Sequence, residues 1–181
     1  MVTDEVATWM KIIRAEDPIA AVLRAHLWVE TDLNALLRIK THKDWSRKVY
    51  GKQFDYFDKV RIALAFDLVM ADLFEALQNL GQLRNDLAHK MGYELTHARQ
   101  HEFLDKIPDY YIDRCRKVIA TILTADFTDS YGDNIQHIEG LEGKRALSQD
   151  FLIGLLAIHY DLSKAYEDIR TDYGLAMDND G

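Results

Sequence analysis

The stretch that decides the fold is DLFEALQNLGQLRNDLAHKM, residues 72–91. Its large apolar side chains recur at alternating intervals of four and three residues, which places them on one face of an α-helix. The members of this stripe are Leu73, Leu77, Leu80, Leu87 and Met91. Arg84 occupies the place in the stripe between Leu80 and Leu87. We therefore expect residues 72–91 to form an amphipathic helix that ends near Gly92.

Helical periodicity continues on both sides of this stretch. Asp17-Pro18 is a helix-start signal, and apolar side chains keep helical spacing from there to about Lys40. The other helices that the pattern predicts cover 3–13, 57–70, 96–107, 109–126 and 144–172. A basic segment around Gly51 and a loop over 127–143 separate them. The sequence thus predicts an all-α protein, an up-and-down helical bundle.

Composition supports one soluble domain. The chain has 181 residues, of which 48 % are hydrophobic, enough for a substantial core. Two prolines and nine glycines are too few for a turn-rich sandwich or barrel. We expect a single helical domain over 1–181, with a core at about 17–126, a C-terminal helix at about 144–172 and a frayed tail at 173–181.

The chain carries the features of a cytoplasmic protein. No apolar stretch approaches the ~18 residues that a membrane span needs. The first residues, Met1-Val2-Thr3-Asp4-Glu5, are acidic where a signal peptide is basic. The single cysteine, Cys115, has no partner for an internal disulfide and lies on the apolar face of its predicted helix, as a core residue does. We expect no membrane partner.

The net charge of −8 is unevenly distributed. Residues 38–61 hold eight Lys and Arg against three Asp, a local net charge of +5, with aromatic residues interleaved. Such a patch attracts a phosphate chain and offers rings on which bases stack. The candidate RNA-binding residues are Lys43, Arg47, Lys48 and Lys52. The alternative is a solvated basic loop whose aromatic side chains turn inward.

Arg84 is out of place in an apolar stripe, because a buried guanidinium is costly unless an anion pairs with it. Three interpretations are open: a snorkelling arginine at the edge of the bundle, half of a buried ion pair, or a residue that binds a phosphate or a partner surface. Glu30 is a candidate for the ion pair, since its own 4–3 spacing also sets it against an apolar face.

Asn85 and His89 are four residues apart and share one helical ridge, so the amide can orient the imidazole of a general acid–base histidine. Arg84 and His89 are five apart, which separates them by about 140° around an ideal helix. They do not point into one pocket from a single regular helix. Either the helix loosens before Gly92, or a second copy of the chain completes the site.

Two segments carry a family resemblance. Arg84-Asn85-Asp86-Leu87-Ala88-His89 resembles the R-x4-6-H signature, often opening Arg-Asn, of the HEPN superfamily of helical bundle proteins. Upstream, FDYFDKVRIALA, residues 54–65, is similar to the branch that includes the mannitol operon repressor. The resemblance covers 54–91, extends back to about residue 17, and ends by about residue 126.

The resemblance implies a homodimeric, metal-independent endoribonuclease of the toxin or defence type, without cofactors, that leaves 2′,3′-cyclic phosphate ends. Carried over by position, Arg84 and His89 would be catalytic, and Asn85 and Glu30 would orient them. An antitoxin or regulatory protein would be a further partner. The mannitol operon repressor-like branch implies the alternative, a non-catalytic regulator of transcription that acts through protein–protein contacts.

A third possibility is a metal enzyme, because His97 and His101 stand four residues apart, a separation that can hold zinc. The HExxH pattern and a third ligand at a recognisable spacing are both missing, so two solvated histidines on a polar helix are the simpler interpretation.

Overall fold

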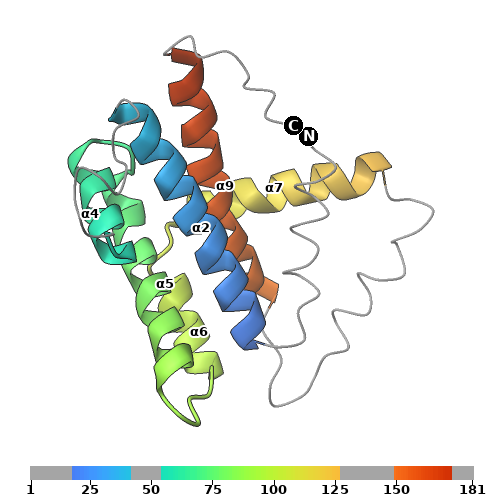
Figure 1. Cartoon of the computed structure of the whole chain (residues 1–181). Helices are drawn as coiled ribbons and strands as arrows, with labels where there is room; N and C mark the ends of the chain where they lie inside the picture. Colours follow the sequence, from blue (N-terminus) through green and yellow to red (C-terminus); the bar gives the residue numbers. More distant parts are fainter. Residues whose placement is uncertain (1–17, 42–53, 127–148, 173–181) are drawn as a thin grey trace.

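The computed structural model describes residues 18–41, 54–126 and 149–172 (Figure 1). The described part of the chain is helical, without strands. Its helices are α2 (Pro18–Lys40), α4 (Tyr56–Ala65), α5 (Ala71–His89), α6 (His97–Leu104), α7 (Asp109–Asp126) and α9 (Gln149–Asp172). The all-α prediction is therefore confirmed. None of these described helices is long and apolar enough to cross a membrane.

The long helices α2 and α9 pack side by side and form the centre of the fold (Figure 1). On one side of this pair, α4 and α5 pack against α2 and against each other. The short helix α6 contacts both α5 and α9. By contrast, α7 lies across α9 instead of alongside it (Figure 1), so the arrangement departs from a strictly up-and-down bundle.

Three predicted helices match the structure closely, and one is wrong in length. The predicted 17–40, 72–91 and 109–126 correspond to α2, α5 and α7. The single buried helix predicted over 57–70 is instead α4 followed by a connection, in which Asp67 adopts a φ of 56° and Phe66 and Met70 are exposed. A positive φ ends a helix, and the short polar side chain of Asp tolerates it better than most. The predicted 3–13 helix, the Gly51 segment and the 127–143 loop lie outside the described residues.

Side-chain caps explain where two helices begin. Asp55 accepts a hydrogen bond from the backbone N–H of Asp58 at 2.9 Å and caps α4. Thr96 accepts one from the N–H of Arg99 at 3.3 Å and caps α6. Each cap satisfies a backbone N–H that the helix itself leaves without a partner.

The core runs between α2, α5 and α9 and continues under α6 and α7. Phe103 of α6 and Phe151 of α9 meet edge-on there, with ring centroids 5.2 Å apart. Cys115 is fully buried, as predicted, and burial raises the pKa of its thiol to about 12. At such a pKa the thiol stays protonated and acts as a packing residue.

Gly81 allows α4 to approach α5 closely. A Cβ at this position would lie 2.7 Å from the ring of Tyr56, closer than real Cβ contacts. The Tyr56 ring therefore occupies the space that a side chain at Gly81 would fill. Its hydroxyl donates a hydrogen bond to the backbone carbonyl of Leu77, at 2.9 Å, one turn earlier in α5.

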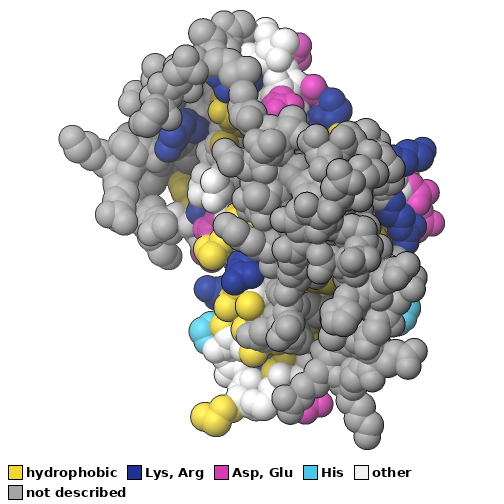
Figure 2. Space-filling model, turned by 90° about the vertical axis from the view of Figure 1, so that its right-hand side faces the viewer, with side chains coloured by type: hydrophobic (Ala, Val, Ile, Leu, Met, Phe, Trp, Pro, Cys, Tyr) yellow, Lys and Arg dark blue, Asp and Glu magenta, His cyan; other side chains and the backbone are white. Residues whose placement is uncertain are grey.

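Charges of both signs are mixed on the described surface that Figure 2 faces, where Lys and Arg side chains lie next to Asp and Glu side chains. Exposed ion pairs elsewhere follow the same pattern, for example Lys106–Glu75 at 3.0 Å. Such pairs contribute at most about 1 kcal/mol each to stability. The informative charges are those that are at least partly buried.

Candidate functional site

Arg84 lies at the edge of the buried face of α5, not within it. The fully buried position is Leu83, while Arg84 and Leu87 are half-buried and Met91 is fully exposed. A strict 4–3 repeat drifts by about 20° per heptad on a straight helix, so the buried face moves off the predicted stripe along α5. Of the alternatives for Arg84, a position at the edge of the bundle agrees with the structure, and the apolar stripe is not buried along its whole length.

The hydrogen bond that positions Arg84 comes from a neutral group. Its Nη1 donates to Oδ1 of Asn85 at 3.0 Å, and both side chains are half-buried. Among the described residues no carboxylate pairs with Arg84. Asn85 thus contacts Arg84 and not, as its spacing predicted, His89. The part of the chain that the structure describes therefore offers the guanidinium no counterion.

Glu30 pairs with Lys59 of α4, not with Arg84. The Nζ of Lys59 lies 2.6 Å from Oε1 of Glu30, and the two side chains are 9 % and 27 % exposed. Helix α4 packs against both α2 and α5, and this packing places Lys59 next to the Glu30 carboxylate. Sequence reasoning counted Lys59 among the residues of a basic segment and therefore missed this pair.

His26 is a member of the site that sequence reasoning missed. It is buried, its ring lies 4.3 Å from the ring of Tyr56, and its Nδ1 is 4.0 Å from Oε2 of Glu30. Burial lowers the pKa of His26 to about 4, and the charges of Arg84 and Lys59 act in the same direction. A signal was available, because His26 shares the apolar stripe of its helix with Glu30.

These side chains form one group, which we call the basic cluster: His26 and Glu30 from α2, Lys59 from α4, and Arg84 and Asn85 from α5. His26 is neutral at physiological pH, and the Glu30 carboxylate offsets one of the two cations. The cluster therefore carries a net charge of about +1 in partly buried surroundings, where charge interactions are stronger than in water.

His89 is exposed and lies outside the basic cluster, on the last turn of α5. The helix stays regular up to this residue, because the N–H of Lys90 still bonds to the carbonyl of Asp86 at 3.0 Å. Of the two sequence-based alternatives, loosening of the helix is thus excluded. Within one chain, Arg84 and His89 point about 140° apart.

Asp86 does not neutralise Arg84 either. Its carboxylate accepts hydrogen bonds from Gln82 at 2.9 Å and pairs with Lys90 at 2.8 Å. The hydrogen bond from Lys90 is the main reason that the pKa of Asp86 lies below its ordinary value. Glu30 and Asp86 are therefore both paired with lysines.

Of the remaining predicted site residues, the structure describes only His97 and His101. Lys43, Arg47, Lys48 and Lys52 lie outside the described residues. His97 and His101 are exposed on α6. Within residues 18–41, 54–126 and 149–172, no group of three or more His, Cys, Asp or Glu side chains is placed to hold a metal ion.

No family model, no curated protein and no solved structure matches the chain. The described residues form a site in which Arg84 has no carboxylate partner, Asn85 accepts its hydrogen bond, and Lys59 pairs with Glu30. Guanidinium groups of this kind bind phosphate or carboxylate through two parallel N–H donors. The arrangement is therefore suited to an anionic ligand.

Acid should destabilise the protein through His26. The folded pKa of about 4 is below the ordinary 6.5, so the unfolded chain binds the proton more readily. The contribution of His26 to the free energy of unfolding is full above about pH 6.5 and is lost as the pH falls to about 4, a change of about 3 kcal/mol.

The variant His26→Phe keeps a ring against Tyr56 and removes the titration. Urea unfolding of both proteins measures the difference between their free energies of unfolding. This difference should change by about 3 kcal/mol between about pH 6.5 and about pH 4. A difference that does not vary with pH would show that His26 is not a buried neutral histidine.

Proposed function

We propose that the protein is a HEPN-like, metal-independent endoribonuclease in which Arg84 binds the scissile phosphate and His89 transfers protons. The observation that carries this proposal is the uncompensated charge of Arg84, since Glu30 is paired with Lys59 and Asp86 with Lys90. A phosphate would supply the missing counterion. The resemblance of residues 84–89 to the HEPN signature supports the same assignment.

The chemistry suits these two side chains. Neutral imidazole of His89 removes the proton of the ribose 2′-OH, and the 2′-oxygen attacks phosphorus as the bond to the 5′-oxygen breaks. The imidazolium returns the proton to the leaving 5′-oxygen. Arg84 stabilises the extra negative charge that develops on the phosphorane oxygens during this displacement. The products are a 2′,3′-cyclic phosphate and a 5′-hydroxyl, and no metal takes part.

The proposal requires two copies of the chain. Because α5 is regular through His89, the two side chains of one copy diverge by about 140°. A symmetric dimer would bring Arg84 of one protomer together with His89 of the partner subunit, twice over. His89 and Met91 are both exposed at this end of α5, where such a contact is open to a second copy.

The test is cleavage of a mixed RNA pool in a single turnover with chelator present. We expect cleavage to persist, to leave cyclic phosphate ends, and to stop when a 2′-deoxynucleotide replaces the scissile ribose, because the nucleophile is then missing. RNA that stays intact at any protein concentration would favour the alternative function, a mannitol operon repressor-like regulator that acts through protein contacts.

A further inference from the structure

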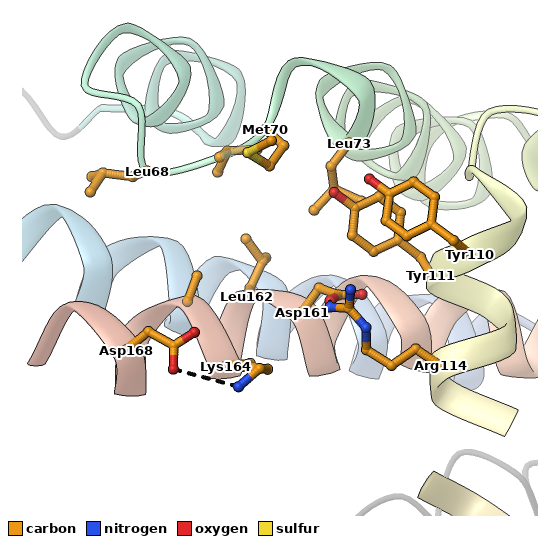
Figure 3. A pocket seen from close by; sticks show the side chains of 12 residues that line it. Leu68, Met70, Leu73, Tyr110, Tyr111, Arg114, Asp161, Leu162, Lys164 and Asp168 are labelled. Atoms are coloured by element: carbon orange, nitrogen blue, oxygen red, sulfur yellow. Dashed lines mark hydrogen bonds and ion pairs between the residues drawn. The ribbon is translucent and has the colours of Figure 1, made fainter. Parts of the chain in front are cut away.

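A cavity of about 290 Å³ lies between the α4–α5 connection, α7 and α9, apart from the basic cluster (Figure 3). The connection and the start of α5 line it with apolar side chains such as Leu68 and Met70. The opposite walls are polar, with Arg114 from α7 and Asp161 and Lys164 from α9. Cavities that take small organic molecules begin at about 300 Å³ and combine apolar walls with a few polar groups in this way.

Asp161 is the unusual residue of this cavity. Its side chain is 7 % exposed, and its Oδ1 accepts a hydrogen bond from Arg114. Its Oδ2 is buried without a hydrogen-bond partner, the one such oxygen or nitrogen among the described side chains. A buried carboxylate oxygen without a donor is costly, so proteins rarely keep one unless something else satisfies it.

The surroundings of Asp161 hold more carboxylates than cations. Tyr110 and Tyr111 both donate hydrogen bonds to Asp72, the latter at 3.1 Å, so that a second carboxylate stands behind the cavity wall. Arg114 lies over both tyrosine rings, at 6.0 and 5.9 Å, and is the cation that pairs with Asp161.

The other cation of the cavity is already paired. Lys164 lies 3.5 Å from Asp168, at the rim and on the same helix. The two cations and two carboxylates of the lining balance, and Asp72 behind the tyrosines adds one negative charge in excess. Burial, with a smaller contribution from Asp72, raises the pKa of Asp161 to about 6, as expected for a carboxylate that lacks part of its counter-charge.

We propose that this cavity binds a small primary amine with an apolar body. The ammonium group pairs with the Asp161 carboxylate, which lines the cavity, and supplies the missing positive charge. The apolar body packs against Leu68, Met70 and the tyrosine rings. The volume limits the ligand to about ten non-hydrogen atoms. This site is independent of the proposed ribonuclease site, because it shares no residue with the basic cluster.

Phenethylamine is a suitable probe, with 2-phenylethanol as its uncharged counterpart and phenylpropionate as the anion. Calorimetry or NMR titration at neutral pH should give the tightest binding for the amine, at least about tenfold weaker binding for the alcohol, and none for the acid. Amine affinity should fall as the pH drops below about 6, where Asp161 becomes protonated. Equal affinities for amine and alcohol would overturn the proposal.

Two variants test the contact directly. Asp161→Asn should weaken amine binding by at least about tenfold, whereas Asp113→Asn, which removes the same charge from an exposed residue of α7 outside the cavity lining, should change it less than about threefold. Equal losses in both variants would mean that bulk charge, not the Asp161 carboxylate, attracts the amine, and would refute the proposed contact.

Ala165→Leu provides a second test, in case Asp161→Asn fails to fold. Ala165 lines the cavity, and the isopropyl group that leucine adds occupies space needed by the aromatic ring of the amine while the carboxylate stays. Binding of phenethylamine should be lost. Unchanged binding to this variant would show that the amine does not occupy the cavity.

Discussion

Replacing His89 with alanine should lower the rate of RNA cleavage by about 10²–10⁴, the usual effect of losing a general acid–base group. His89 is exposed at the end of α5, so the fold should be unaffected, with a change in the free energy of unfolding within about 0.5 kcal/mol. Single-turnover rates on one RNA, together with thermal melts, separate the two effects.

The matched control is His101→Ala, which removes another exposed helical histidine. This variant should cleave RNA at the wild-type rate. If activity instead survives His89→Ala but is lost with His101→Ala or in chelator, the acid–base assignment is wrong and the metal alternative with His97 and His101 regains support.

Mixing two inactive variants tests whether the site is shared between protomers. In a heterodimer of Arg84→Ala and His89→Ala chains, one site keeps Arg84 from one chain and His89 from the other. Random association should therefore restore about a quarter of the wild-type rate. No recovery, in a mixture shown to exchange subunits, would mean that each site draws both residues from a single chain.

Replacing Glu30 with leucine should destabilise the protein by about 3–5 kcal/mol, because it leaves the ammonium of Lys59 buried without a partner. We expect the lower half of this range, since Glu30 is 27 % exposed and water can enter the space. Urea unfolding at neutral pH measures the change.

The double variant Glu30→Leu/Lys59→Met removes both charges and should return stability close to that of the wild type. Arg84→Met is the second control and should cost less than about 1 kcal/mol, because no described carboxylate depends on Arg84. A large loss from Arg84→Met and a small one from Glu30→Leu would make Arg84, and not Lys59, the structural cation.

Local patterns predict most of the helices. The helices α2 and α5 follow from a periodic apolar face, with a start signal before α2 and a glycine after α5, and α7 from its periodic face alone. The end of α4 could not be predicted in this way. The helix ends where Asp67 adopts a positive φ. Aspartate also occurs within helices, so its presence in the sequence does not mark an end.

The candidate site was predicted less well, because it depends on contacts between helices. The sequence pattern singled out Arg84 and Glu30, and both belong to the basic cluster. The sequence analysis offered Glu30 as the partner of Arg84. It could not foresee that α4 brings Lys59 to Glu30, because that contact depends on how the helices pack. Burial of His26 follows from packing against Tyr56 and is likewise a property of the assembled helices.

The missing side chain at Gly81 determines how rigid this assembly is. Since the Tyr56 ring fills that space and its hydroxyl is held by the Leu77 carbonyl, the spacing of α4 and α5 is set by the thickness of one aromatic ring. The ring of His26 packs against the same Tyr56 ring, and Lys59 follows Tyr56 by one turn of α4. The entropy of ordering these groups is thus lost during folding, and the phosphate of the proposed function would bind to side chains that need little rearrangement.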